Sequence, residues 1–268
     1  MTPLRVGSLF AGIGGLELGL ERAGMQTVFQ VEIDDYARRI LQKHWPAVPK
    51  FGDVRDVGPH NLPTCDVLCG GFPCQDISQA GARLGIDEGE RSGLWREFHR
   101  LICELRPKYV ILENVRAILH PLREEDGATN SSAPIARVLG DLAACGYDAE
   151  WDCFPASAFG APHQRDRFFC VAYPNGAGWV RSNKVFVKSD EATRTEKAHE
   201  QWAGYSVARG DSGRIRVLPP PGVQRMANGV PSRMDADRLK TLGNAVSPVV
   251  AEHVGRCVMR HWRAACAS

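Results

Sequence analysis

The stretch of sequence that decides the fold is residues 5–20, which read RVGSLFAGIGGLELGL. Residues 5–10 are mostly apolar, as in a buried strand, and residues 11–15 supply a glycine-rich turn. The apolar residues between Leu16 and Leu20 then predict a helix. A strand, a glycine turn and a helix in this order are typical of the first unit of a nucleotide-binding α/β fold. One glycine-rich turn is a weak signal, so the fold also depends on the strands and helices after residue 20.

Acidic residues follow the next two predicted strands. The strand at residues 27–31 ends at Glu32, about 20 residues past the glycines, where an acid would accept the two ribose hydroxyls of an adenosine ligand. Asp53 follows the third predicted strand. The dinucleotide fingerprint is incomplete and the GxxxxGK[ST] loop is missing, so a nucleoside triphosphate is not expected. S-adenosylmethionine fits, while ordinary turn glycines and solvated acids are the alternative interpretation.

A cysteine follows the fourth predicted strand. The apolar run at residues 67–69 leads into Gly70-Gly71-Phe72-Pro73-Cys74-Gln75. The glycines allow a sharp turn, and Pro73 stiffens the backbone directly before Cys74. A cysteine on a rigid loop at a strand end is a candidate nucleophile, and the alternative is an inert buried thiol. Residues 75–94 are rich in Gly, Asp and Ser, which predicts a mobile lid or a disordered segment.

The rest of the chain extends the α/β pattern. We expect a helix at 94–105, a strand at 109–112 ending at Glu113, a polar loop at 122–134, a helix at 135–145, and strands at 151–154 and 168–172. Ser247-Pro248 is a typical helix start, and apolar residues follow at helical spacing. Because a doubly wound sheet needs both faces covered, this last helix is expected to return beside the first helix. That would place residues 243–246 next to the glycine turn.

The predicted fold class is therefore α/β, with a doubly wound, mostly parallel, Rossmann-like sheet and a small irregular second domain. The expected boundaries are 1–173 for a catalytic and cofactor-binding domain, 174–240 for a small domain, and 241–268 for a segment that completes the first domain. A chain of 268 residues with 44% apolar residues can bury a core of this size.

Composition excludes some classes of protein. No run of about 18 apolar residues is present, so no membrane span is expected. Residues 1–5 lack the layout of a signal peptide, which predicts a cytoplasmic protein. Without a secretory signal the nine cysteines are interpreted as reduced thiols. Cys65, Cys69 and Cys74 lie close together, but their spacing is not CxxC, so no metal site is expected.

Basic residues are concentrated late in the chain. Residues 174–240 hold 12 Lys and Arg against seven Asp and Glu, whereas residues 1–173 hold 18 against 23. A polyanion could dock on such a region, and the alternative is a solvated basic surface.

Five motifs, in this order, resemble those of the DNA cytosine-5 methyltransferases. They are FAGIGG at 10–15, GFPCQ at 71–75, ENV at 113–115, QRDR at 164–167 and GNAV at 243–246. The resemblance runs from residue 7 to about 173 and again from about 230 to 260. The pairing of Pro-Cys with Glu-Asn-Val is its most specific part. Residues 174–230 match no motif, and in this family a variable target-recognition region lies there.

The resemblance implies site-specific methylation of carbon 5 of cytosine in double-stranded DNA, with S-adenosylmethionine as cofactor and S-adenosylhomocysteine as product. Cys74 would add to carbon 6 of a flipped-out base, and Glu113 would protonate ring nitrogen 3. Arg165 would stabilise charge on the cytosine carbonyl oxygen, and Arg167 would position Arg165 or Glu113. One departure from the family pattern is His163, which stands where a glutamine is common.

The resemblance also implies binding residues. The implied cofactor-binding residues are Phe10, Gly12, Ile13, Gly14, Gly15, Glu32, Ile33, Asp53, Val54, Pro73, Asn244 and Val246. The expected DNA-binding residues are Gln75, Ser78 and Arg91 near the cysteine, and Arg181, Arg214 and Arg216 in the basic region.

Two other functions stay open. One is methylation of cytosine in RNA by a protein of the same fold, and the other is a DNA-binding module that has lost activity. We expect a monomer encoded by a prokaryote or a phage, and a cognate restriction endonuclease acting separately is a candidate partner.

Overall fold

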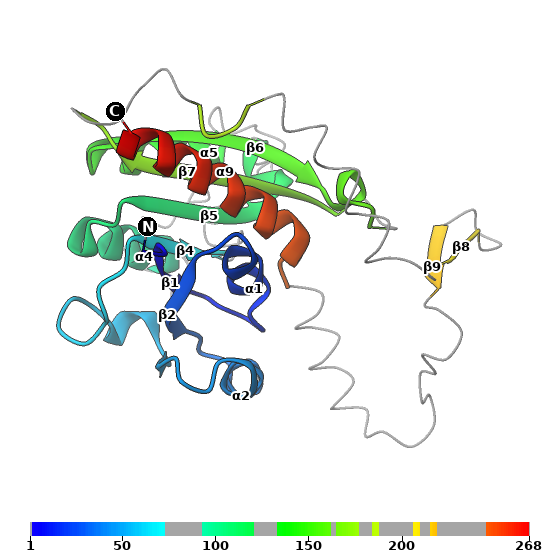
Figure 1. Ribbon diagram of the computed structural model, residues 1–268, viewed down its shortest axis with the longest axis horizontal. Coiled ribbons are helices and arrows are strands. Elements are labelled where there is room, and N and C mark those ends of the chain that lie inside the picture. Colours follow the sequence, from blue (N-terminus) through cyan, green and yellow to red (C-terminus); the bar gives the residue numbers. More distant parts are fainter. Residues whose placement is uncertain are drawn as a thin grey trace, which may run out of the picture.

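The computed structural model describes residues 2–72, 93–120, 133–161, 165–176, 184–187, 206–209, 215–218 and 245–267 (Figure 1). The strands are β1 (Arg5–Leu9), β2 (Gln26–Val31), β3 (Lys50–Phe51), β4 (Val67–Gly70), β5 (Tyr109–Val115), β6 (Tyr147–Pro155), β7 (Asp166–Pro174), β8 (Ser206–Arg209) and β9 (Ile215–Leu218). The helices are α1 (Gly15–Arg22), α2 (Asp35–His44), α4 (Gly93–Leu105), α5 (Pro134–Ala144) and α9 (Pro248–Ala267), with short 3-10 turns η1 (Val54–Asp56), η3 (Arg116–Leu119) and η4 (Ala156–Phe159).

Seven strands form one sheet in the order β3-β2-β1-β4-β5-β7-β6. The first five of these run parallel, and β7 runs antiparallel to both β5 and β6. From β1 the strands are added on one side of the sheet as far as β3, and from β4 onward they are added on the other side. The direction in which strands are added therefore reverses between β1 and β4. In open α/β sheets, ligands bind beyond the carboxyl ends of the strands at such a reversal. The predicted doubly wound, mostly parallel sheet is confirmed, and β8 and β9 pair separately as an antiparallel hairpin-like unit.

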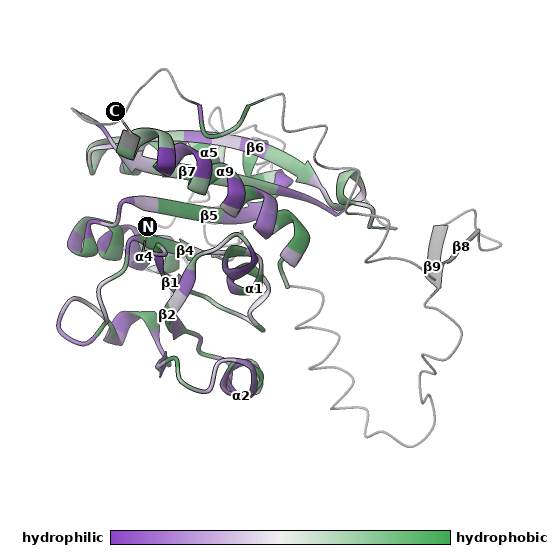
Figure 2. Ribbon diagram, in the orientation of Figure 1, coloured by the Kyte–Doolittle hydropathy of each residue, from purple (hydrophilic) through white to green (hydrophobic). Residues whose placement is uncertain are grey.

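Alternate residues of the central strands point to opposite faces of the sheet, and each face has its own core. On β4, Val67 and Cys69 belong to the core beneath α1 and α9, whereas Leu68 belongs to the core beneath α4 and α5. Strands covered on both faces read as continuous apolar runs. Figure 2 shows this for β5, whose middle is hydrophobic, whereas α9 alternates hydrophilic and hydrophobic residues. The pattern explains why the central strands could be predicted from sequence.

The C-terminal helix α9 packs along α1 on one face of the sheet, as the sequence predicted (Figure 1). Glycines permit the close approach of the two helices. A Cβ atom at Gly19 would lie 2.4 Å from Ala251 Cβ, and one at Gly255 would lie 2.7 Å from Ala23 Cβ. The segment before α9 is equally close, because a Cβ atom at Gly15 would lie 2.2 Å from the carbonyl oxygen of Val246.

This packing predicts opposite effects for two glycine-to-alanine changes in helices. Gly19→Ala is expected to lower the free energy of unfolding by about 1–3 kcal/mol, because the new methyl group overlaps α9. Gly140→Ala in α5 is the matched control, since no atom of another described element lies within 4 Å of its Cβ position. It is expected to raise the free energy of unfolding by up to about 1 kcal/mol. Urea denaturation measures both, and equal effects would contradict this account of the α1–α9 contact.

One expectation about the cysteines is wrong. The structure joins Cys103 on α4 to Cys145 at the end of α5 by a disulfide, with Cα atoms 6.0 Å apart, whereas reduced thiols were expected throughout. The two residues are 42 positions apart in sequence, so only the packing of the two helices reveals their proximity. The six other cysteines of the described ranges take part in no disulfide.

Some predictions lie wholly or largely outside the described residues. They are the lid at 75–94, of which only 93 and 94 are described, the loop at 122–134, of which 133 and 134 are described, and most of the 174–240 domain. Within the described ranges, no helix has the length and apolar character needed to cross a membrane.

Candidate active site

The glycine turn after β1 opens the site at the carboxyl ends of the strands. Phe10, Gly12 and Gly14 all have positive φ angles, of 53°, 57° and 89°, so the chain turns sharply before α1 begins. Glycine adopts such angles without strain, but Phe10 does so at a cost. The ring of Phe10 lies 6.1 Å from the ring of Phe98 on α4, measured between centroids. A Cβ atom at Gly14 would meet the Trp45 ring at 2.3 Å, so this glycine is also required by packing.

The acids that follow β2 and β3 are held by backbone amides. Glu32 accepts hydrogen bonds from the backbone N–H of Gly12 at 2.7 Å and of Asp34 at 2.8 Å, one on each carboxylate oxygen. Glu32 therefore ties the end of β2 to the glycine turn after β1. Asp53 precedes η1 and accepts from the backbone N–H of Arg55 at 2.9 Å. Each carboxylate keeps lone pairs that can accept a further hydrogen bond.

These elements enclose a cavity of about 510 Å³, within the range of small-molecule sites. Most of the predicted cofactor-binding residues line it. They are Phe10, Gly12, Ile13, Gly15, Glu32, Ile33, Asp53, Val54 and Val246. Gly14 does not line the cavity, and its place is in the turn itself. Leu94 and Ala245 line the wall as well, although the sequence predicted no cofactor contact for either of them. Gly71 and Glu113 also line the cavity, so the acid of β5 faces the same space as the glycine turn.

Glu113 lies directly against the chain that leads to Cys74. β4 and β5 are parallel neighbours with Gly70 opposite Leu112, so their carboxyl ends meet. A Cβ atom at Gly71 would lie 2.6 Å from Glu113 Oε2, so a larger residue there would displace the carboxyl group from its present position. Gly71 is three residues before Cys74 in the sequence. The structure thus places the predicted acid beside the base of the predicted nucleophile loop.

Two arginines at the start of the neighbouring strand β7 and directly before it lie near Glu113. β7 pairs with β5, and Arg167 Nε lies 3.1 Å from Glu113 Oε1. Burial raises the pKa of Glu113 to about 7, although the charges of Arg167 and Arg165 act to lower it. Burial lowers the pKa of Arg165, and the neighbouring charge of Arg167 lowers it further. A carboxyl group in this environment can hold a proton near neutral pH and release it.

Arg165 also joins the site to the chain before α9. Its Nη2 donates a 2.7 Å hydrogen bond to the carbonyl oxygen of Ala245, which lines the cavity. The backbone of Arg165 has a positive φ of 29°, an uncommon conformation for a non-glycine residue. The same guanidinium therefore contacts the returning segment and stands near Glu113.

Asn114 is a positioning residue that the sequence analysis did not assign. Its Nδ2 donates a 3.0 Å hydrogen bond to the carbonyl oxygen of Phe72, two residues before Cys74. Its Oδ1 accepts from the backbone N–H of Val115. The side chain is buried, as is Phe72, whose ring packs 5.1 Å from that of Trp95. The only sequence signal was its place directly after Glu113, which does not indicate a partner.

Asn114→Ala is expected to leave the carbonyl oxygen of Phe72 buried without a donor. Such an orphaned group costs about 1–3 kcal/mol, so the free energy of unfolding should fall by that amount. Asn175→Ala is a surface control, because Asn175 is exposed just after the end of β7. Thermal and urea unfolding of both variants test this. An Asn114→Ala protein as stable as the Asn175→Ala protein would contradict the positioning role.

A second buried acid lies beneath the glycine turn. Glu17 on α1 is fully buried and its Oε1 accepts from Gln30 Nε2 at 3.4 Å. Burial raises the pKa of Glu17 to about 7. The folded protein therefore holds this proton over a pH range in which the unfolded chain has released it.

Glu17 should make stability depend on pH. A raised pKa in the folded state means that stability is full below pH 4.5 and is lost as the pH rises through 7. Glu17→Gln removes this dependence, so the variant should gain roughly 3 kcal/mol over the wild type at pH 8 and about nothing at pH 4.5. Urea unfolding across this range measures the difference, with Glu104→Gln as a control on the exposed face of α4. Parallel stability profiles would refute the buried-acid account.

Several predicted site residues lie outside the described ranges. They are Cys74, Pro73, Gln75, Ser78, Arg91, His163, Arg181, Arg214 and Asn244. Arg216 falls in β9, where the backbone is described. Their proposed roles stay predictions.

The fold and the cavity define a Rossmann-like α/β protein whose cavity is lined by a glycine turn and a buried acid. The family model of the C-5 cytosine-specific DNA methylases matches residues 4–213. The chain belongs to this family.

The chain is similar to several curated relatives. It is 38% identical over 173 residues to the type II methyltransferase M2.BsuMI of Bacillus subtilis (strain 168), an overlap of 63% of this chain and 42% of the relative. It is 36% identical over 233 residues to the type II methyltransferase M.Eco47II of Escherichia coli, which covers 81% of this chain and 53% of the relative. The chain thus spans about half the length of these relatives.

Solved structures share the fold. A crystal structure described as a prophage-encoded DNA modification methyltransferase from E. coli superposes with a TM-score of 0.64 at 19% identity, covering 97% of this chain and 99% of the other. The methyltransferase EhMeth of Entamoeba histolytica superposes with a TM-score of 0.62 at 14% identity, covering 98% and 99%.

Proposed function

We propose that this protein methylates carbon 5 of cytosine at specific sites in double-stranded DNA, with S-adenosylmethionine as methyl donor. The observation that carries the proposal is the position of Glu113. This acid, with its raised pKa, faces the cavity formed by the glycine turn and contacts the backbone that leads to Cys74. Membership of the C-5 cytosine-specific DNA methylases supports the same reaction.

The residues that line the cavity fit S-adenosylmethionine. Glu32 and Asp53 offer carboxylate oxygens for the ribose hydroxyls and the adenine amino group, while Ile33 and Val54 offer apolar surface for the adenine ring. Gly12 lines the cavity with a positive φ and no side chain, so the ligand can approach its backbone. When bound there, S-adenosylmethionine would supply an electrophilic methyl group for carbon 5 of the cytosine.

The chemistry proposed for the chain's own residues begins with Cys74. Its thiolate adds to carbon 6 of a flipped-out cytosine, which forms an S–C6 bond and moves electron density toward carbon 5. Glu113 donates its proton to ring nitrogen 3 and so neutralises the charge that builds there. After carbon 5 has been methylated, a base removes its proton, the S–C6 bond breaks and the C5–C6 double bond returns. The proton on nitrogen 3 goes back to Glu113.

The arginines complete the proposed site electrostatically. Arg165 stands near Glu113 with a guanidinium that can stabilise negative charge on the cytosine carbonyl oxygen. Arg167 is bound to Glu113 Oε1 and so orients the acid. Because both cations favour the ionised carboxyl group, they set a limit on how far burial can raise its pKa.

DNA contacts are proposed for residues 174–240, which we treat as a small target-recognition domain between the catalytic domain at 1–173 and its completing segment at 241–268. The net charge of +5 in residues 174–240 supports this, because a basic surface attracts the phosphate backbone. Arg181, Arg214 and Arg216 are the proposed contacts there, with Gln75, Ser78 and Arg91 near the flipped base. We also propose that the enzyme acts as a monomer, separately from any cognate restriction endonuclease.

The test is transfer of a radiolabelled methyl group from S-adenosylmethionine to duplex DNA, to transfer RNA and to no acceptor, measured side by side. The expected result is labelling of the DNA alone, with 5-methylcytosine as the labelled nucleoside after digestion. Bisulfite sequencing of the same DNA should place the methyl groups within one short sequence. Labelling of RNA alone would replace the proposal by an RNA methyltransferase, and binding to DNA without any transfer would indicate an inactive DNA-binding module.

A further inference from the structure

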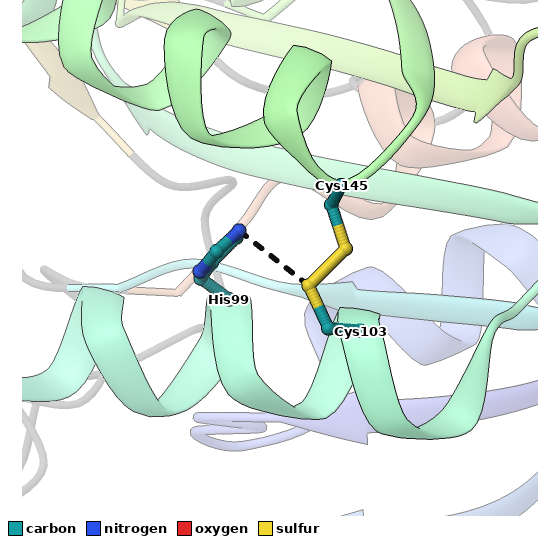
Figure 3. A group of neighbouring side chains, drawn as sticks. All are labelled: His99, Cys103 and Cys145. Atoms are coloured by element: carbon teal, nitrogen blue, oxygen red, sulfur yellow. Dashed lines mark hydrogen bonds between the residues drawn. A yellow bond between two sulfur atoms is a disulfide. The ribbon is translucent and has the colours of Figure 1, made fainter.

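Three side chains with metal-ligating atoms gather between α4 and α5 (Figure 3). His99 and Cys103 lie one turn apart on α4, and Cys145 lies at the end of α5. The imidazole nitrogen and the two sulfur atoms all lie within 4.8 Å of one another. None of the three lines the cavity described above, and the proposed methyl transfer uses none of them. The cluster therefore needs an explanation of its own.

Other contacts hold the two helices together at this point. Trp95 Nε1 donates to Asp141 Oδ2 at 2.8 Å, and His99 Nε2 lies 3.0 Å from the carbonyl oxygen of Asp141. Trp95, His99 and Cys103 are spaced four residues apart, so they form one stripe on α4. This stripe faces Asp141 and Cys145, which are also four residues apart on α5. The cluster is thus positioned by packing as well as by the disulfide, and should persist when the disulfide is reduced.

We propose that, in the reduced protein, His99, Cys103 and Cys145 bind one zinc-class divalent metal ion. Thiolate and imidazole are the ligands that zinc prefers. With Zn–S near 2.3 Å and Zn–N near 2.0–2.1 Å, tetrahedral geometry places a nitrogen and a sulfur ligand about 3.6 Å apart. His99 Nε2 and Cys103 Sγ are 3.6 Å apart (Figure 3). Three protein ligands leave the fourth position to water.

Metal binding and the disulfide exclude each other. An external dithiol reduces the Cys103–Cys145 bond by supplying two electrons and two protons, and itself becomes a disulfide. The metal ion then displaces the two thiol protons, and the sulfur atoms move apart to about 3.8 Å as tetrahedral ligands. When His99 Nε2 binds the metal ion, its contact with the carbonyl oxygen of Asp141 is lost. Arg106 Nη1 lies 3.6 Å from Cys145 Sγ, where its charge favours the thiolate but repels a metal ion.

The experiment is a titration of the reduced chain with Co²⁺. The protein is first reduced and then separated from the reductant under nitrogen. The titration is repeated with the Cys74→Ala variant, so that the thiol of Cys74 cannot contribute. The expected result is one equivalent bound, with the thiolate-to-cobalt charge-transfer band and the intense visible bands of tetrahedral Co²⁺. Added Zn²⁺ should abolish both signals. The oxidised protein should show neither of them.

Variants assign the ligands. Cys103→Ser, Cys145→Ser and His99→Ala should each weaken Co²⁺ binding by more than the roughly 10–100-fold typical of losing an outer-shell partner. Cys153→Ser and Cys266→Ser are the matched controls, because these free cysteines lie outside the cluster, and they should bind as the wild type does. Circular dichroism checks that each variant is folded. Reduced wild type without a tetrahedral Co²⁺ signal overturns the proposal, and so does binding that survives Cys103→Ser, Cys145→Ser or His99→Ala.

Discussion

Replacement of Glu113 by glutamine is expected to lower methyl transfer to duplex DNA by about 10²–10⁴-fold, the range typical of losing a positioned proton donor. Glutamine keeps the size and shape of the side chain and can still contact Arg167, but it cannot give a proton to ring nitrogen 3. The loss should appear in kcat, because the proton is transferred as charge builds on the ring. DNA binding should change little, because the proposed DNA contacts are made by other residues and the substitution keeps the size of the side chain.

The pH dependence gives a sharper test of the same residue. The protonated form of Glu113 is the donor, and burial raises its pKa to about 7. The donor fraction is therefore nearly complete below pH 6 and falls about tenfold for each pH unit above 7. A rate limited by this donor should decline on the alkaline side in the wild type, and that decline should be missing in Glu113→Gln.

Single-turnover rates between pH 5.5 and 9, with DNA and S-adenosylmethionine saturating, measure both effects. Glu97→Gln is a suitable control, because Glu97 on α4 is paired with Arg100 and lies outside the cavity. Its pH profile should match that of the wild type. A Glu113→Gln enzyme that keeps more than about a tenth of the wild-type rate would rule out proton donation by this carboxyl group.

The second large effect concerns the sulfur nucleophile. Cys74→Ala is expected to reduce methyl transfer to the background rate, because no other group is proposed to add to carbon 6. With DNA that carries 5-fluorocytosine, the wild type should form a covalent adduct. Carbon 5 then carries fluorine in place of the proton that a base would remove, so the S–C6 bond persists. The adduct should survive denaturing electrophoresis, and Cys74→Ala should form none.

Other cysteines provide controls for this result. Cys69 lies five residues earlier on β4, is fully buried, and has a pKa raised by burial, so it is a poor nucleophile. Cys266 lies on the exposed part of α9. Cys69→Ala and Cys266→Ala should both still form the adduct, although Cys69→Ala should lose stability through the cavity it leaves. An adduct that Cys74→Ala retains would transfer the nucleophile role to another residue.

The fold could be predicted from sequence where one local pattern sets the structure. Continuous apolar runs marked β1, β4 and β5, since both of their faces are covered, and the Ser247-Pro248 pair marked the start of α9. Pattern was less informative at the sheet edges. β3 has only two residues. β6 begins earlier than predicted, at Tyr147, because the polar residues Asp148 and Glu150 interrupt the apolar pattern there.

The grouping of site residues was predictable in part for a similar reason. Residues that follow parallel strands meet at one edge of the sheet, so Glu32, Asp53 and Glu113 could be expected near the glycine turn. The contacts that fix their positions could not be read from sequence. Asn114 binds a backbone oxygen 42 residues away, and Arg165 binds one 80 residues away. Every residue type has a backbone carbonyl, so the sequence does not indicate which carbonyl accepts a hydrogen bond. Nor does it indicate that Gly71 leaves space for the carboxyl group of Glu113.

The return of α9 to α1 has a consequence for biosynthesis. Leu16 and Leu20 of α1 are buried in the core that α9 completes, and Val246 and Ala245 close the cavity beside Gly15. While the ribosome is still adding residues before 245, the earlier strands and helices can fold, but this apolar surface stays open to water. The nascent chain should therefore be a ligand for chaperones until α9 emerges, and synthesis halted before that point should yield aggregation-prone fragments.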